Sequence, residues 1–138
     1  MLVKILWLSG SGIFLVLGTL HLYYTFFTGK FNARNKTVTT EMKNTSPVLT
    51  GETTMWNAWI GFNASHSAGA IFFGLINILL AAQYFPVIQN SVLVILLNIT
   101  TVVFYCWLAK KYWFRVPFTG ILLATGCFVA SSIIICLG

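Results

Sequence analysis

Hydrophobic residues fill four long runs of this chain, and polar residues gather in the short stretches between the runs. The runs cover about residues 5–27, 57–82, 87–109 and 115–137. Each supplies the roughly 20 residues that an α-helix needs to cross about 30 Å of hydrocarbon. Lipid cannot hydrogen-bond free backbone groups, so such runs must be helical. The pattern predicts an all-α integral membrane protein, an antiparallel four-helix transmembrane bundle that forms one domain over residues 1–138.

The ends of the runs carry further signals. The first run is too long for a signal peptide and ends without a small-residue cleavage site, so we expect it to remain as an anchor. Pro86 lacks an amide donor and restricts the residue before it, which ends the second run near Ala82.

Residues 28–54 form an unusually long connection. Val38 and Met42 lie four residues apart, which allows a short helix at the membrane interface, with a plain polar connector as the alternative.

Composition narrows the class of protein. Hydrophobic residues make up 58% of the chain and charged residues only 7%, whereas soluble domains have about a quarter of their residues charged. A water-soluble globule is therefore excluded, and the lipid bilayer is the expected environment. The net charge is +6, but the basic residues flank the apolar runs and form no exposed stripe. We therefore expect no nucleic-acid partner.

The basic residues also predict an orientation. Of the eight Lys and Arg residues, only Lys4 lies on the side that holds both termini and the turn near residues 83–90. The other seven lie in the first and third connections: Lys30, Arg34, Lys36, Lys43, Lys110, Lys111 and Arg115. By the positive-inside rule, the connection 28–54 is cytoplasmic and both termini are periplasmic.

The only two histidines of the chain are expected at a similar depth in the membrane. His21 lies about 9 Å inside the end of the first run, and His66 about 12 Å inside the second. Asn63 and Tyr105 approach the same level, and Trp59 lies one turn from Asn63. Because an ionisable side chain within a span normally faces the bundle or a wet cavity, we predict a polar pocket in the cytoplasmic third.

This pocket allows several chemical interpretations. His21 and His66 could be the axial ligands of a haem. They could instead bind Cu or Zn with Cys106 as a third ligand. A third interpretation is a polar relay for a proton or small solute through His66, Asn98 and Asn77. Finally, the histidines and Asn63 could simply hydrogen-bond the first two helices together.

Other chemistry is missing from the sequence. There is no aspartate, and both glutamates lie in the connection 28–54, so no paired buried carboxylates and no serine–histidine–acid set can form in the membrane. We therefore predict a non-enzymatic role: a ligand-binding protein or an accessory subunit of a membrane complex. Homo-oligomers are also expected through a small-residue face of Gly61, Ser65 and Gly69. The alternatives are a haem- or metal-dependent redox protein and a lipid-modifying enzyme with a histidine base.

Three segments carry a resemblance to a known family. They read TTMWNAWIGFNASHS at residues 53–67, HLYYTF at 21–26 and YWFRVP at 112–117. With these segments the chain resembles an uncharacterised family of small bacterial four-helix integral membrane proteins. The resemblance extends over nearly the whole chain and implies a bacterial inner-membrane protein with this topology. It implies no activity.

Overall fold

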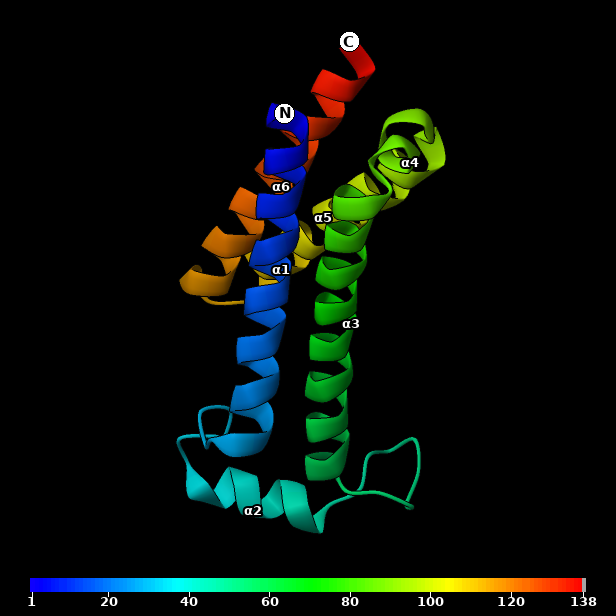
Figure 1. The fold of residues 1–138 in the computed structure, drawn as a ribbon. Helices are drawn as coiled ribbons and strands as arrows, with labels where there is room; N and C mark the ends of the chain where they lie inside the picture. Colours follow the sequence, from blue (N-terminus) through cyan, green and yellow to red (C-terminus); the bar gives the residue numbers. More distant parts are fainter. Residues whose placement is uncertain (138) are drawn as a thin grey trace. The chain divides into compact units, whose positions relative to one another are not determined.

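The chain folds entirely into α-helices and their connections in a computed structural model that describes residues 1–137 (Figure 1). Four long helices carry the apolar runs, and two short ones lie between them. In chain order they are α1 (Leu2–Phe27), α2 (Lys36–Asn44), α3 (Met55–Gln83), α4 (Phe85–Asn90), α5 (Val92–Tyr112) and α6 (Arg115–Leu137). This confirms the predicted all-α class.

The four long helices, α1, α3, α5 and α6, have the length and composition of membrane spans. They contain 26, 29, 21 and 23 residues. At 1.5 Å per residue even the shortest is about 31 Å long, which is the thickness of the hydrocarbon layer. Apolar side chains surround most of each helix, as expected where one face meets lipid and the other meets protein. The chain is therefore a small multi-pass membrane protein with four candidate spans.

The third span begins later than predicted. The sequence suggested a run over 87–109, whereas the structure has the short helix α4 and then a new start at Val92. Pro86 lies in the first turn of α4, where its missing amide is tolerated. The hydroxyl of Ser91 accepts a hydrogen bond from the backbone of Val94 at 3.4 Å and so caps α5. Hydropathy alone could not detect this break, because α4 is itself largely apolar.

The residues divide into two compact units. Met1–Leu17 and Ala70–Gly138 form one, which we call the core unit, and Gly18–Gly69 forms the other, which we call the histidine unit. The core unit contains the first part of α1, the second part of α3, and α4 to α6. The histidine unit contains the end of α1, the connection with α2, and the start of α3.

Aromatic side chains pack against one another inside the core unit. Phe14 meets Phe73 at a ring-centroid distance of 4.8 Å and Tyr105 at 5.3 Å, while Trp7 meets Phe128 edge-on at 5.0 Å. Trp7, Phe14 and Phe128 are fully buried. Edge-to-face pairs of this kind contribute about 0.5–1.5 kcal/mol beyond their buried area. These contacts connect α1 to α3, α5 and α6.

Polar contacts define one end of the core unit. The ammonium of Lys4 donates to the carbonyl of Ala82 at 3.4 Å, and the hydroxyl of Ser131 donates to the carbonyl of Val3 at 3.1 Å. The beginning of α1 therefore lies beside the end of α3 and the last turns of α6. Within this unit, the start of the chain and the α3–α4 turn are at the same end (Figure 1).

In the histidine unit, α2 lies crosswise to the end of α1 and the start of α3 (Figure 1). The side chain of Asn35 caps α2 by accepting from the amide of Thr37 at 3.0 Å. The amide of Met55 donates to the carbonyl of Thr45 at 2.8 Å and so holds the end of α2 near the start of α3. The spacing of Val38 and Met42 thus does mark a short helix and not a plain connector.

Candidate functional site around His21 and His66

The histidine unit brings His21, Asn63 and His66 together. His21 is on α1, six residues before the helix ends at Phe27. Asn63 and His66 are on α3, three residues apart, a spacing that puts both on one helix face. His21 Nε2 is 2.9 Å from Asn63 Oδ1, and the rings of His21 and His66 meet edge to face with centroids 5.5 Å apart.

A second hydrogen bond of Asn63 orients its contact with His21. Its Nδ2 donates to the backbone carbonyl of Trp59 at 2.8 Å. A carbonyl only accepts, so this bond requires the amide nitrogen to face Trp59 and the amide oxygen to face His21. The proton between the two side chains therefore belongs to His21 Nε2. A neutral His21 then presents its other nitrogen, Nδ1, as an acceptor.

An aromatic residue from the connection covers His21. The ring of Phe31 lies 4.5 Å from the His21 ring at an angle of 36°, and 6.4 Å from the ring of Tyr24. His21 is thus held between Phe31 and His66 and is half-buried. The connection after α1 therefore folds back over the last turns of that helix. Sequence reasoning missed Phe31, because nothing in a loop's local pattern shows that it returns to the helix before it.

Hydroxyl groups on both helices bond to the backbone at the cluster. Thr25 donates to the carbonyl of His21 at 2.8 Å, and Ser67 donates to the carbonyl of Asn63 at 2.7 Å. Both hydroxyls are thereby satisfied within their own helix, as a buried polar group requires. The two residues are almost fully buried.

The other predicted pocket residues have different surroundings. Trp59 is 40% exposed, and it is its backbone carbonyl that orients Asn63. Tyr105 belongs to the core unit, where its ring packs against Phe14 and, at 6.3 Å, against Trp113. Cys106, also in the core unit, is a half-buried free thiol. The cluster that the structure draws together is therefore His21, Asn63 and His66.

The positions of the histidine nitrogens limit how the cluster could bind a metal ion or a haem. Among residues 1–137, no group of three or more His, Cys, Asp or Glu side chains is placed to hold a metal ion. A metal shared by both imidazoles would lie about 2 Å from one nitrogen of each ring. His21 Nε2 is engaged by Asn63, so only His21 Nδ1 could serve without breaking the bond to the amide. The arrangement fits hydrogen bonding more directly than it fits metal ligation.

The chain was compared with protein families, curated proteins and solved structures, and none of the three comparisons found a match.

Proposed function

We propose that this protein is a non-enzymatic, multi-pass protein of a bacterial inner membrane that binds a lipid-soluble ligand, either alone or as an accessory subunit of a membrane complex. In this proposal the cluster of His21, Asn63 and His66 holds the polar head group of the ligand. The apolar remainder of the ligand lies among the lipid chains. The connection 28–54 faces the cytoplasm and both termini face the periplasm.

The observation that carries this proposal is the contact of two imidazoles inside candidate spans. Ionisable residues within spans are expensive to place in lipid, and they commonly mark sites for substrates, ions or ligands. A purely structural link between two helices needs one donor and one acceptor, which His21 and Asn63 already supply at 2.9 Å. His66, with its ring 5.5 Å from that of His21, places a second imidazole beside that link.

The chemistry of the cluster restricts the ligand. His21 offers an acceptor at Nδ1, and the nearby Phe31 offers an aromatic surface 4.5 Å from the imidazole. Both glutamates lie in the connection, Glu41 within α2 and Glu52 beyond it, and neither is within a span. A cationic head group would therefore find no countercharge within the spans. We propose a neutral or anionic head group that bears a hydroxyl or carbonyl.

A redox function is the second candidate. Two imidazoles on neighbouring helices, 5.5 Å apart, could ligate a metal if His21 turned to use Nδ1 or released Asn63. In that case the cofactor would supply electron transfer, and the two histidines would hold it. The same purification tests both candidates.

The test is to purify the protein in a mild detergent and in nanodiscs of phosphatidylethanolamine and phosphatidylglycerol. The native mass spectrum, the absorption spectrum and the metal content are then recorded together. We expect an organic adduct of defined mass whose occupancy falls about tenfold in His66→Phe, the equivalent of one lost buried hydrogen bond.

The matched control is Ser65→Ala. Ser65 is exposed and adjoins His66 on α3, and among residues 1–137 its hydroxyl bonds only to the carbonyl of Phe62 in its own helix. Occupancy should be unchanged in this variant. A wild-type protein without any adduct in both media would overturn the proposal. A Soret band or a stoichiometric metal, lost in His66→Phe, would establish the redox candidate instead.

A further inference from the structure

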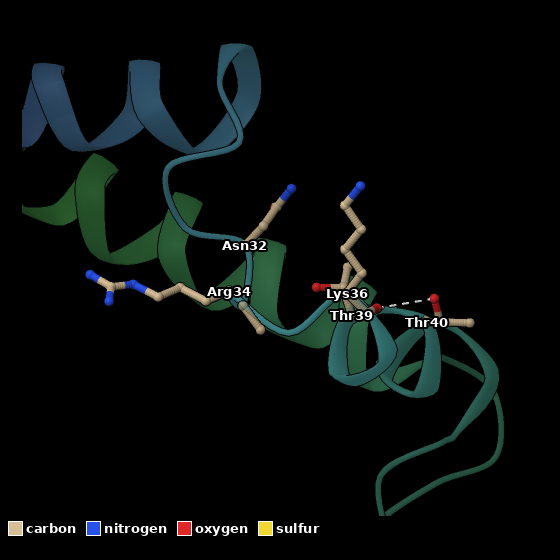
Figure 2. A pocket seen from close by; sticks show the side chains of 6 residues that line it. Asn32, Arg34, Lys36, Thr39 and Thr40 are labelled. Atoms are coloured by element: carbon tan, nitrogen blue, oxygen red, sulfur yellow. Dashed lines mark hydrogen bonds between the residues drawn. The ribbon is translucent and has the colours of Figure 1, made fainter.

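A basic pocket opens in the histidine unit, between the chain that leaves α1 and the first turns of α2 (Figure 2). Its volume is about 380 Å³. It is lined by Asn32, Ala33, Arg34, Lys36, Thr39 and Thr40. Two cations, one amide and two hydroxyls thus surround the space, and no carboxylate is among them. Figure 2 shows Asn32 and Lys36 extending in the same direction, with Arg34 to the side.

The four basic residues of the connection fall into two pairs. The ammonium of Lys30 lies 4.0 Å from the ring centroid of Tyr24, and that of Lys43 lies 5.3 Å from the ring of Trp56. These two cations are engaged by aromatic faces. The side chains of Arg34 and Lys36 have no ion-pair or ring partner among residues 1–137. The two cations of the connection without an ion-pair or ring partner among the described residues are therefore the two that line the pocket.

One hydrogen-bonding group beside the pocket has no partner among residues 1–137. The hydroxyl oxygen of Thr39 is shielded from solvent and has no hydrogen-bond partner among the described residues. The neighbouring hydroxyl of Thr40, in contrast, donates to the carbonyl of Lys36 at 3.1 Å (Figure 2). The pocket adjoins the N-terminus of α2, the positive end of the helix dipole. Each of these features favours an anion that accepts hydrogen bonds.

The connection places the pocket next to a candidate span. Phe31 immediately precedes the lining residue Asn32, and its ring packs on His21 inside α1. The pocket therefore lies close to the end of α1. Clusters of four or more Lys and Arg residues directly after a span commonly bind anionic lipid. Residues 30–43 contain four such residues within 14 positions.

We infer that this pocket binds a phosphate group, supplied either by the head group of an anionic membrane lipid or by a free phosphate ion. Arg34 and Lys36 provide the charge, and the side-chain amide of Asn32 provides hydrogen bonds. Arginine suits this role because its planar guanidinium donates two parallel hydrogen bonds to phosphate oxygens. The inference does not depend on the histidine cluster, because it involves other side chains and another class of ligand.

The test compares two double variants in nanodiscs. Arg34→Gln with Lys36→Gln removes the pocket cations, and Lys30→Gln with Lys43→Gln removes the same charge from the aromatic-bound pair. Retention of phosphatidylglycerol over phosphatidylcholine is measured by native mass spectrometry after partial delipidation. Binding of inorganic phosphate is measured by titration in phosphatidylcholine nanodiscs. Circular dichroism checks that both variants keep the helical content of the wild type.

We expect the pocket variant to bind roughly 30-fold more weakly, since each Lys or Arg near an anionic surface contributes about 1 kcal/mol and 1.4 kcal/mol is tenfold. The control variant should lose about threefold at most, because its cations do not line the pocket and are held against aromatic rings. Asn32→Ala should weaken binding without changing charge. Preference for phosphatidylglycerol assigns the pocket to lipid, and binding of inorganic phosphate without that preference assigns it to the free ion. Equal losses in the two double variants, or no phosphate and no lipid preference in the wild type, would overturn the inference.

Discussion

The indole nitrogen of Trp7 donates a hydrogen bond to the side-chain oxygen of Asn77 at 2.9 Å, joining α1 to α3 inside the core unit. Trp7 is fully buried and Asn77 is 2% exposed. The amide nitrogen of Asn77 donates to the carbonyl of Phe73 at 3.0 Å, so its oxygen faces Trp7. The pair satisfies two polar groups that neither lipid nor the apolar core could satisfy.

Trp7→Phe should reduce the free energy of unfolding by about 1–3 kcal/mol, because it leaves the Asn77 oxygen buried and unpaired. Combining it with Asn77→Leu removes both polar partners, so the double variant should lose less than the sum of the two single losses. The expected coupling is about 0.5–2 kcal/mol. The measurement is unfolding by sodium dodecyl sulfate in mixed micelles. Strictly additive losses would show that the hydrogen bond contributes nothing.

Asn98 provides a contrast with Asn77. Both residues are buried. In each, the side-chain amide nitrogen donates a hydrogen bond to the backbone carbonyl four residues earlier in the helix. For Asn98 this is the carbonyl of Val94, at 2.8 Å. The oxygen of Asn98, however, has no hydrogen-bond partner among the described residues. Asn98→Leu should therefore leave the unfolding free energy unchanged or raise it by about 1 kcal/mol, whereas Asn77→Leu should lower it. Equal destabilisation by both substitutions in the same unfolding assay would contradict this reading.

Gly74 on α3 lies directly against the backbone of α1 in the core unit. A β-carbon added there would lie 2.8 Å from the backbone nitrogen of Leu15 and 2.8 Å from the carbonyl oxygen of Ser11. Because backbone atoms cannot move aside, Gly74→Ala should lower the unfolding free energy by about 1–3 kcal/mol. Gly126→Ala is the control: nothing lies within 4 Å of that position, and alanine should be neutral or stabilise α6 by up to about 1 kcal/mol. A neutral Gly74→Ala would show that the helices can separate there at no cost.

The positions of the long helices along the chain were predictable from the sequence. The residues of each helix that are buried inside the protein were less predictable. Apolar length and lipid physics determine the spans, so the four long helices were predictable. In α1, Ser11, Phe14 and Thr25 are buried. A tryptophan near the end of a span normally belongs to an interfacial aromatic belt, yet Trp7 is fully buried against Phe128. Its hydrogen bond to Asn77 depends on which helices are neighbours, and a single sequence does not encode that directly.

The candidate site was likewise predictable only in part. Equal depth along two helices brought His21, Asn63 and His66 together in the prediction, because helix rise is constant. The roles of Phe31 and of the pocket beside α2 depend on the path of the connection after α1. That path is determined by side-chain contacts between the connection and α1, such as Phe31 on His21 at 4.5 Å. Periodicity gives no information about it.

The proposed orientation can be tested with single cysteines in a background that lacks Cys106, Cys127 and Cys136. Val48→Cys reports on the connection 28–54, and Gln89→Cys reports on α4; both native side chains are exposed. The excess of basic residues in the first and third connections predicts that an impermeant thiol reagent labels Gln89→Cys in intact cells. It should label Val48→Cys only after the membrane is opened. The reverse pattern would refute the orientation.

The two histidines allow a direct measurement of the central claim, since selective labelling with ¹⁵N-histidine gives only two imidazole signals from the whole chain. In synthetic-lipid nanodiscs at about pH 8, where an ordinary imidazole is neutral, His21 should carry its proton on Nε2. That proton position follows from the 2.9 Å contact with Asn63 Oδ1. Asn63→Leu should remove this preference.

The decisive step is to add the total lipid extract of cells that express the protein. If His21, Asn63 and His66 hold the head group of a lipid-soluble ligand, the imidazole signals of both histidines will shift and saturate, and Asn63→Leu will weaken the effect about tenfold. If both signals stay unchanged while the proton on His21 Nε2 remains in place, the cluster only joins α1 to α3, and the proposed ligand site is contradicted.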